Sequence, residues 1–379
     1  MIEDNKGFLY PSVDMTQCID CGLCNKVCIE YAQFEKRFPI KAYASKNYDD
    51  EVRGSSSSGG IFPMLAKAVL ERGGVVFGVR FDDKWECVHD YIEDISEIHL
   101  FQGSKYVPSR IGDSYIKAEK FLKEGRAVLF SGTSCQIAAL NRFLGQEYAN
   151  LLTLEVTCHG VPSPAVWRKY LDTILKRARK GKNTVSALPI FHHKGRDTLG
   201  GSAIERISFR DKGTGWEKFS FALSLGKPNG AGKKNSVSLS HTHEEDPFMR
   251  LFIYDVILRP SCYHCPAKSG KTMSDFTLAD FWHIDKIMPD FNDDKGVTLV
   301  YLNTLKAIDF YNRLQCDDRE MSIQDATERK VAWFLDNRKK NPFRSLYFLL
   351  YHIVDFDSLA NFVTNYKYVK IIKKILKIK

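Results

Sequence analysis

Short apolar segments alternate with amphipathic segments between Gly59 and Arg177. Phe62–Arg72 has helical spacing and ends at Gly73-Gly74, and the apolar run that follows has the composition of a buried strand. The same order then recurs. The expected elements are strand Val75–Val79, strand Ala127–Ser131, helix Gln136–Leu144, strand Leu151–Thr157 and helix Pro164–Arg177. This order predicts an α/β fold, a mostly parallel sheet core with helices on both faces.

Other segments have different patterns. Ser186–Thr242 is glycine-rich and alternates polar with apolar residues, which predicts an antiparallel hairpin insertion, and Val297–Leu302 predicts one more strand. Ile29–Ser58 is polar and predicts a connector, whereas Ser345–Lys379 has helical periodicity. We expect three parts: a cysteine-rich head and connector (1–45), a catalytic domain (46–310) and a helical C-terminal region (311–379).

Composition places the chain among globular proteins. Its 379 residues are 44% hydrophobic, enough for an ordinary core, and no apolar run approaches the roughly 18 residues of a membrane-spanning helix. The first residues lack the basic-then-apolar order of a signal peptide, so we expect a cytoplasmic location. Ten cysteines in that compartment predict metal or redox chemistry rather than disulfides.

The net charge of +9 comes mostly from the end of the chain. Six lysines lie in Tyr366–Lys379, where there is no acid, which leaves +3 for the remainder. A nearly balanced body does not predict nucleic-acid binding. The tail interleaves lysines with aliphatic residues. It is expected either to contact anionic lipid as a peripheral membrane helix or to dock on its own domain or a partner, and both alternatives stay open.

The head contains four closely spaced cysteines: Cys18, Cys21, Cys24 and Cys28. Their C-x2-C-x2-C-x3-C spacing is typical of bacterial ferredoxins and predicts a [4Fe-4S] cluster. In two-cluster ferredoxins the fourth cysteine binds the other cluster, so one ligand of the head cluster is not identified by the spacing. A zinc site or free thiols are the alternatives.

A second group of cysteines is dispersed along the chain. Cys135 follows one predicted strand where a helix begins, and Cys158 follows the next strand. If these strands are parallel, both thiols lie at the carboxyl edge of the sheet, where α/β folds bind ligands. Cys262 and Cys265 add two thiols on a turn, which predicts a [4Fe-4S] site. The alternatives are ordinary buried cysteines or half of a zinc site. Cys87 and Cys316 are expected to be structural, in a strand and a helix.

Two segments have features of a phosphate-binding site. Ser55–Gly60 leads directly into a helix, whose first amides suit a phosphate, although flexible linkers have the same composition. Gly103–Tyr106 adds a cation and an aromatic ring. There is no G-x-G-x-x-G sequence, so a standard dinucleotide fold is not supported.

These motifs together resemble the beta subunits of coenzyme F420 hydrogenase/dehydrogenase, in particular bacterial members with a ferredoxin-type head. The matching stretches are Cys18–Cys28, Ser55–Phe62, Gly73–Val79, Gly103–Val107, Leu129–Ala138, Thr157–Pro164, Arg259–Cys265 and Ser274–Trp282. Ser134 stands where such proteins usually have proline, and His283 where they have glycine. Members with this head usually carry a second ferredoxin motif before it. For this protein, we expect that motif in another chain, for example a second ferredoxin-like subunit.

The resemblance implies a flavoprotein oxidoreductase in which clusters pass single electrons and FAD exchanges two. The implied ligands of the core cluster are Cys135, Cys158, Cys262 and Cys265. The implied flavin contacts are Ser58, Gly59, Gly60, Gly103, Ser104, Lys105 and Tyr106. A redox partner protein or soluble carrier is implied, but no substrate, although many bacterial members are encoded near surface-polysaccharide genes. The alternative is a zinc-stabilised scaffold without redox activity.

Three further polar positions have open roles. His159 beside Cys158 either serves a cluster or makes an ordinary hydrogen bond, and Asp280 either contacts a ligand or caps a turn. His241-Thr-His243 has metal-like spacing without a third ligand, so we expect a solvated loop there.

Overall fold

The computed structural model describes residues 1–179, 203–227, 235–328 and 336–365. The strands are β1 Ile2–Glu3, β2 Leu9–Tyr10, β3 Lys41–Lys46, β4 Val75–Phe81, β5 Cys87–Ile92, β6 Ser109–Arg110, β7 Val128–Thr133, β8 Leu151–Val156, β9 Ala203–Asp211, β10 Ser220–Lys227, β11 Asn235–Thr242, β12 Phe276–Asp280, β13 Thr298–Leu302 and β14 Asp317–Met321. The α-helices are α1 Leu23–Val27, α2 Asp50–Ser55, α3 Ile61–Leu70, α4 Ser114–Lys123, α5 Ser134–Leu144, α6 Pro164–Arg179, α7 Pro247–Ile253, α8 Ile284–Ile287, α9 Leu305–Tyr311, α10 Ile323–Glu328, α11 Arg344–Leu350 and α12 Phe356–Thr364. Short 3-10 helices are η1 Ile29–Tyr31, η2 Ile95–Leu100, η3 Pro260–His264 and η4 Pro289–Phe291.

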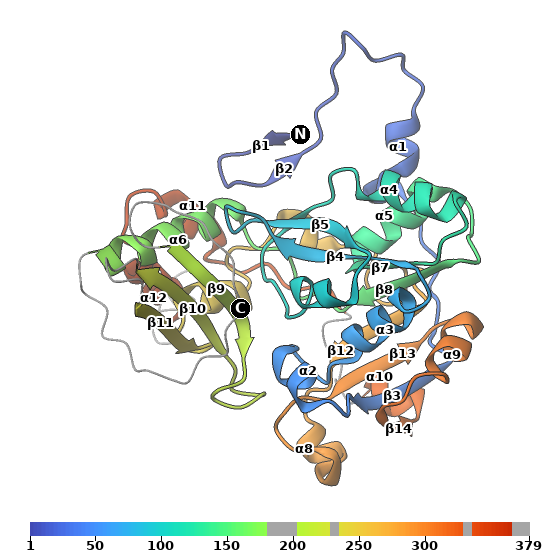
Figure 1. Cartoon of the computed structure of the whole chain (residues 1–379). Coiled ribbons are helices and arrows are strands. Elements are labelled where there is room, and N and C mark those ends of the chain that lie inside the picture. Colours follow the sequence, from blue (N-terminus) through green and yellow to red (C-terminus); the bar gives the residue numbers. More distant parts are fainter. Residues whose placement is uncertain (180–202, 228–234, 329–335, 366–379) are drawn as a thin grey trace.

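A nine-stranded sheet forms the centre of the molecule, in the order β14-β3-β13-β12-β8-β7-β4-β5-β6 (Figure 1). Its four middle strands, β12, β8, β7 and β4, are parallel, while β13, β3 and β14 at one flank and β5 at the other join their inner neighbours antiparallel. The predicted α/β class with a parallel core is confirmed. The antiparallel flanks follow from chain connections that periodicity along the sequence does not reveal.

Helices cover both faces of this sheet. On one face, Leu65 of α3 packs in a cluster with Leu129 of β7. On the other face, Leu122 of α4 and Leu140 of α5 pack with Phe130, the next residue along β7. Because successive strand residues point to opposite faces, this alternation divides the core into two apolar layers.

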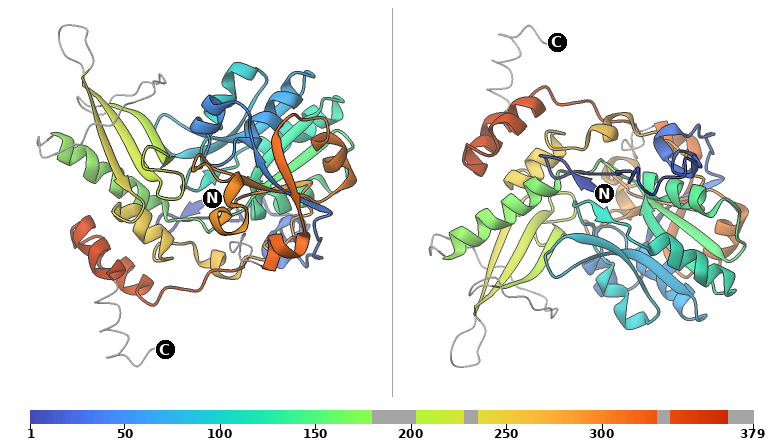
Figure 2. Two further views of the ribbon diagram at one scale, coloured as in Figure 1. Left: turned by 90° about the horizontal axis from the view of Figure 1, so that it is seen from below. Right: turned by 90° about the horizontal axis from the view of Figure 1, so that it is seen from above.

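A second lobe lies beside the sheet, as Figures 1 and 2 show. The antiparallel sheet β11-β10-β9 packs with α6, α7, α11 and α12 around one aromatic cluster. In it, the Trp167 ring of α6 lies 5.2 Å from Phe209 and 5.1 Å from Phe248. The predicted antiparallel insertion is confirmed for the described strands; residues 180–202 and 228–234 lie outside them.

The structure differs from three sequence expectations. The expected connector Ile29–Ser58 contains β3, a buried strand of the main sheet. Its buried residues include small Ala42 and Ala44, so this part of the sequence shows no apolar run. Cys316 follows α9 rather than lying in a helix. The C-terminal helical region is divided into α11 and α12.

Among the described residues, no helix has the length and apolar character needed to cross a bilayer. Residues 366–379, which carry the lysines of the predicted basic tail, lie outside the described part of the chain.

Candidate functional site

A cavity of about 1370 Å³ opens beyond the carboxyl ends of the parallel strands. Its walls come from the main sheet, the second lobe and the end of the head segment. The sequence-predicted residues that line it are Ser58, Gly60, Gly103, Ser104, Lys105, Tyr106, Cys135, Cys158, Cys262 and Cys265. The structure therefore brings most of the predicted core and flavin residues to one place.

Cys135 and Cys158 reach this cavity from neighbouring strands. β7 and β8 are parallel, with Thr133 opposite Val156 at their carboxyl ends. Thr133 caps α5 through a reciprocal capping box with Gln136, so Cys135 enters the first turn of that helix, and the Thr133 hydroxyl lies 3.3 Å from its Sγ. The predicted meeting of two thiols at one sheet edge follows from this parallel register.

Cys262 and Cys265 lie on and just after η3. The backbone N–H of Arg259 donates to Val161 O at 2.7 Å, and the N–H of Val161 donates to Cys262 Sγ at 3.3 Å. These bonds tie the turn that carries Cys262 to the loop that follows Cys158. Segments about a hundred residues apart are thus fixed side by side at the cavity.

The environment of the four thiols opposes their ionisation. Burial, with added repulsion from Cys135 and Cys265, raises the pKa of the Cys262 thiol to about 12. Burial also raises the pKa of Cys158 strongly, with added repulsion from Cys262 and Cys135. Thiolates here need a compensating cation. No three Cys, His, Asp or Glu side chains of the described residues converge closely enough to hold a single metal ion.

Ser58, Gly59 and Gly60 are held by the main sheet. The Ser58 hydroxyl donates to Val297 O at 2.7 Å, and the Gly59 N–H donates to the Thr298 hydroxyl at 2.8 Å. A Cβ on Gly59 would lie 2.3 Å from Ser45 O, so only glycine allows this approach. Gly59 does not contribute to the cavity wall, whereas Gly60 lines it at the start of α3.

Gly103–Tyr106 faces the same space. The Ser104 N–H donates to the Ser57 hydroxyl at 2.5 Å, which joins the two predicted flavin segments. Lys105 Nζ donates to Gln102 O at 3.1 Å, and burial lowers its pKa to about 8. Lys105 lines the same cavity as the first turn of α3.

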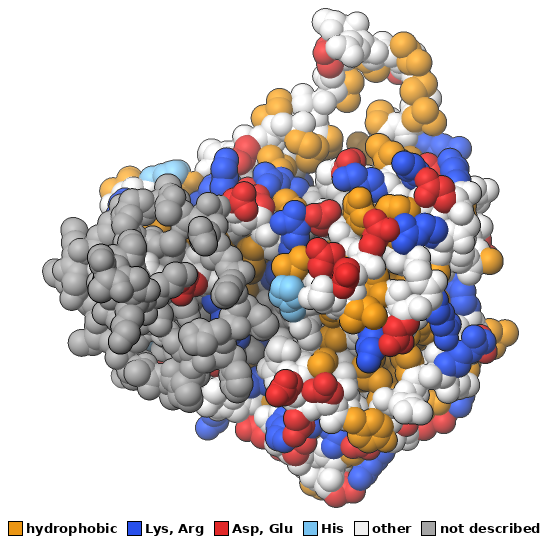
Figure 3. All heavy atoms as spheres, viewed as in Figure 1, with side chains coloured by type: hydrophobic (Ala, Val, Ile, Leu, Met, Phe, Trp, Pro, Cys, Tyr) orange, Lys and Arg blue, Asp and Glu red, His pale blue; other side chains and the backbone are white. Residues whose placement is uncertain are grey.

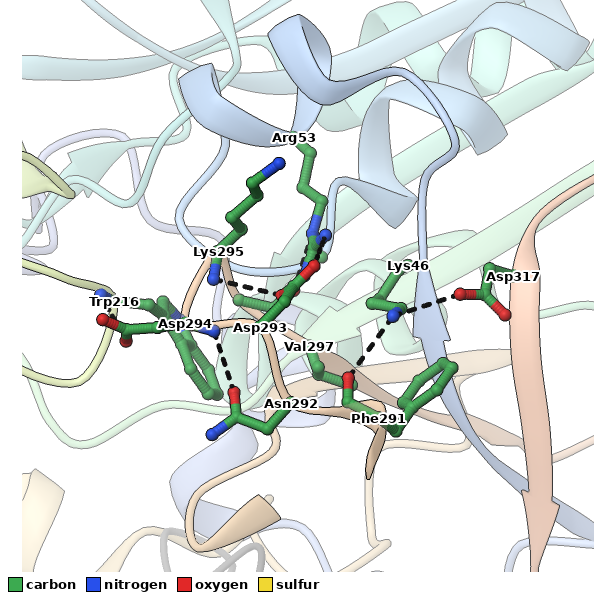
Figure 4. Close-up of polar contacts among 12 residues, drawn as sticks. Lys46, Arg53, Trp216, Phe291, Asn292, Asp293, Asp294, Lys295, Val297 and Asp317 are labelled. Carbon is green, nitrogen blue, oxygen red and sulfur yellow. Dashed lines mark hydrogen bonds and ion pairs between the residues drawn. The ribbon is translucent and has the colours of Figure 1, made fainter. Parts of the chain in front are cut away.

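An ion pair fastens this region from the other side (Figure 4). The guanidinium of Arg53 is buried and binds Asp293 at 2.6 Å through Nη1 and the Gly296 carbonyl at 2.9 Å through Nε. The neighbouring Asp294 accepts the Trp216 N–H at 2.9 Å, and Lys295 pairs with exposed Asp50. The loop 293–296 thereby connects α2 with the second lobe.

Arg210, Trp282 and His243 also line the cavity, and sequence reasoning assigned none of them to the site. Arg210 Nη1 binds Asp280 at 2.5 Å, so Asp280 has an ion-pair partner at the end of β12. His243 stacks on Phe219 at 4.4 Å and belongs to the cavity wall rather than a solvated loop. In the sequence, the strand end at Asp280 signalled this wall, but nothing there pointed to Arg210.

His159 has a polar partner within the protein. Its Nε2 lies 2.7 Å from Asp255, which also receives Arg338 Nε at 3.2 Å. Burial lowers the pKa of His159, against the raising effect of Asp255. This pairing is the ordinary hydrogen-bonded role that the sequence left open.

The head cysteines lie apart from the cavity. Cys18, Cys21 and Cys24 are exposed, and Cys28 is half-buried. α1 and η1 contact α5, and Arg142 of α5 donates to the Lys26 carbonyl. Ile29 and Glu30 line the cavity, so the head ends beside the core thiols.

The sequence profile of one family, described as the C-terminal part of the beta subunit of coenzyme F420 hydrogenase/dehydrogenase, matches residues 125–328. That range covers more than half of the chain and includes all four core cysteines. The chain belongs to this family. A hydrogenase/dehydrogenase beta-subunit family indicates a redox role.

Two further comparisons, with solved structures and with curated proteins, do not add to the family assignment. A chain of the F420-reducing [NiFe] hydrogenase complex from Methanosarcina barkeri, determined after xenon derivatization, is 14% identical with a TM-score of 0.44, over 90% of this chain and 94% of that chain. That similarity is too low to carry an argument about chemistry. A search of curated proteins gives no match.

Proposed function

We propose that this beta-subunit family member is an iron-sulfur flavoprotein oxidoreductase, passing electrons between [4Fe-4S] clusters, FAD and a carrier or substrate. One observation carries the proposal: four cysteines from distant segments line a single cavity together with Ser58, Gly60 and Gly103–Tyr106. Family membership supports the redox class.

The residues present fit the proposed groups. Cys135, Cys158, Cys262 and Cys265 would hold the core cluster, since four thiolates are its usual ligand set and each binds a different iron, so they need not meet at one point. Because burial raises the pKa of Cys158 and Cys262, thiolates at these positions would need a positively charged partner such as the iron of a cluster. Cys18, Cys21, Cys24 and Cys28 would hold a second cluster in the head.

The flavin segments supply complementary groups. Gly60 is the N-cap of α3, where the helix N-terminus and its dipole favour a phosphate, and Lys105 lines the same cavity. When bound, the clusters supply one-electron transfer and the flavin supplies two-electron chemistry. The Gly59 N–H, bound to the Thr298 hydroxyl, holds the Ser58–Gly60 backbone, and the Arg53 ion pair holds the neighbouring loop 293–296.

The proposal extends to the setting of the protein. We propose a cytoplasmic, reducing location, supported by ten free cysteines, and a redox partner protein or soluble carrier that meets the exposed head. The division into head and connector (1–45), flavin and cluster domain (46–310) and C-terminal region (311–379) is part of the same proposal. Surface-polysaccharide metabolism stays a prediction from the resemblance.

Anaerobic purification tests the proposal directly. The wild-type chain is expected to show flavin bands and a broad iron-sulfur absorption, with iron, sulfide and flavin measured per chain. Cys158→Ser is expected to lose most of the core iron, whereas Cys316→Ser, outside the cavity, keeps it. A colourless protein that contains zinc, or equal iron in both variants, would overturn the proposal and favour the scaffold alternative.

A further inference from the structure

Three buried N–H donors meet at one wall of the cavity without acceptors. Nε and Nη2 of Arg210 and Nε1 of Trp282 have no hydrogen-bond partner among the residues that the structure describes. The Arg210 guanidinium carbon lies 5.1 Å from the centre of the Trp282 ring, so the two side chains that carry these donors are neighbours. Buried polar nitrogens are nearly always paired, and three unpaired donors in one place indicate a missing acceptor.

Other contacts fix the position of Arg210. Its Nη1 binds Asp280 at 2.5 Å and donates to the Tyr106 hydroxyl at 3.3 Å. Its guanidinium lies 4.1 Å from the Phe219 ring. One edge of the group is therefore occupied, and the Nε–Nη2 edge remains. This edge is a planar pair of donors, the geometry that binds a carboxylate or phosphate through two oxygens.

The charged groups around this wall are largely paired with one another. Asp280 pairs with Arg210, and Asp293 pairs with Arg53. Burial, together with the charges of Arg210 and Arg53, lowers the pKa of Lys212 to about 7. Glu217 also lines the cavity, and burial raises its pKa. The unpaired Nε–Nη2 edge of Arg210 and the Nε1 of Trp282, rather than an excess of cations, therefore favour an oxyanion.

We propose that Arg210 and Trp282 bind an oxyanion, a carboxylate or phosphate, of the molecule that exchanges electrons in this cavity. The location of the site follows from the donors, and the redox role of its ligand rests on the proposed function. Tyr106 and Phe252 stack at 4.9 Å in the same wall, so aromatic surface surrounds the anion site. The oxyanion approaches from the cavity, which both donor side chains line.

Benzoate, phenyl phosphate and neutral benzamide serve as probes, with binding to the full chain measured by calorimetry. One or both anions are expected to bind wild type about tenfold more tightly than benzamide, since charge-assisted pairs exceed neutral ones. Comparing the two anions distinguishes carboxylate from phosphate.

Four variants test the roles of the side chains. Arg210→Gln is expected to remove the preference for anions, and Arg210→Lys is expected to keep part of it. Asp280→Asn strengthens anion binding, because it removes the competing charge. Arg206→Gln, on the same strand outside the cavity wall, is the matched control.

The opposite effects of Arg210→Gln and Asp280→Asn separate recognition from folding, because a structural role alone predicts that both weaken binding. The inference is overturned if wild type prefers neither anion, or if Asp280→Asn weakens anion binding in protein with a native circular dichroism spectrum. It is also overturned if Arg210→Gln releases flavin while the preference for anions persists. If purified wild type contains neither iron nor flavin but still prefers the anions, the proposed function alone is refuted.

Discussion

The head and the core present four cysteines each in opposite ways. The head cysteines are adjacent in sequence and mostly exposed, on a segment whose hydrophobic side chains also face outward (Figure 3). The core cysteines come from three distant segments and line one cavity because β7 and β8 are parallel and η3 is tied to Val161. Closely spaced cysteines indicate a cluster site from the sequence alone, whereas dispersed cysteines form a site only when the whole sheet has folded.

The largest expected effect is a loss of iron that differs between a core cysteine variant and a head cysteine variant. Cys158→Ser is expected to abolish the core cluster and lower the melting temperature, because metal binding to a site formed by distant segments stabilises the folded state. Cys21→Ser is expected to remove only the head iron. Iron and sulfide per chain, electron paramagnetic resonance and thermal melting measure the difference. Loss of the core signal in Cys21→Ser would contradict the separation.

Sequence reasoning found the core thiols because strand ends are visible in a pattern. Cys135 and Cys158 each follow an apolar run, and a parallel register brings such ends together. It missed β3, whose buried residues include only one large side chain, Tyr43, beside Ala42, Ala44 and Ser45. It also missed Arg210, which reaches the cavity from a strand of the other lobe. Contacts between lobes depend on three-dimensional packing, and no spacing in the sequence encodes them.

The Arg53 ion pair tests how far the core site depends on distant segments. Arg53→Ala is expected to lower the free energy of unfolding by about 3 kcal/mol, since it leaves the Gly296 carbonyl and Asp293 without their buried partner. Flavin affinity is expected to fall with it, because this loop leads directly into Val297, whose carbonyl accepts the Ser58 hydroxyl. Denaturant titration and flavin content measure both. Lys295→Ala, which breaks only an exposed pair with Asp50, is the control, and an equal loss there would refute the role of burial.

Acid is expected to weaken the core sheet through His89. His89 is buried, its Nε2 lies 3.1 Å from Ser131 O of β7, and burial lowers its pKa from 6.5 to about 4. A lowered folded pKa means that the unfolded state binds more protons, so stability is present above pH 6.5 and is lost as pH falls toward 4. Between pH 7 and pH 5 the loss is about 2 kcal/mol.

His89→Gln is expected to flatten this pH dependence, as followed by denaturant titration at both pH values. His99→Gln, at an exposed position, serves as the control. If both variants keep the full slope between pH 7 and pH 5, another group is responsible for the acid sensitivity of the sheet.

The smallest expected effect concerns the contact between head and core. Arg142 of α5 donates to the Lys26 carbonyl, and α5 also carries Cys135, so one helix touches both sites. Arg142→Ala is expected to speed amide exchange over residues 23–31 severalfold while leaving β7 and β8 protected, because one hydrogen bond at the surface contributes about 1 kcal/mol. Lys26→Ala keeps the carbonyl acceptor and is expected to change nothing. Faster exchange in β7 as well would show that head and core open together, and the head would then be part of the core fold rather than a locally determined unit.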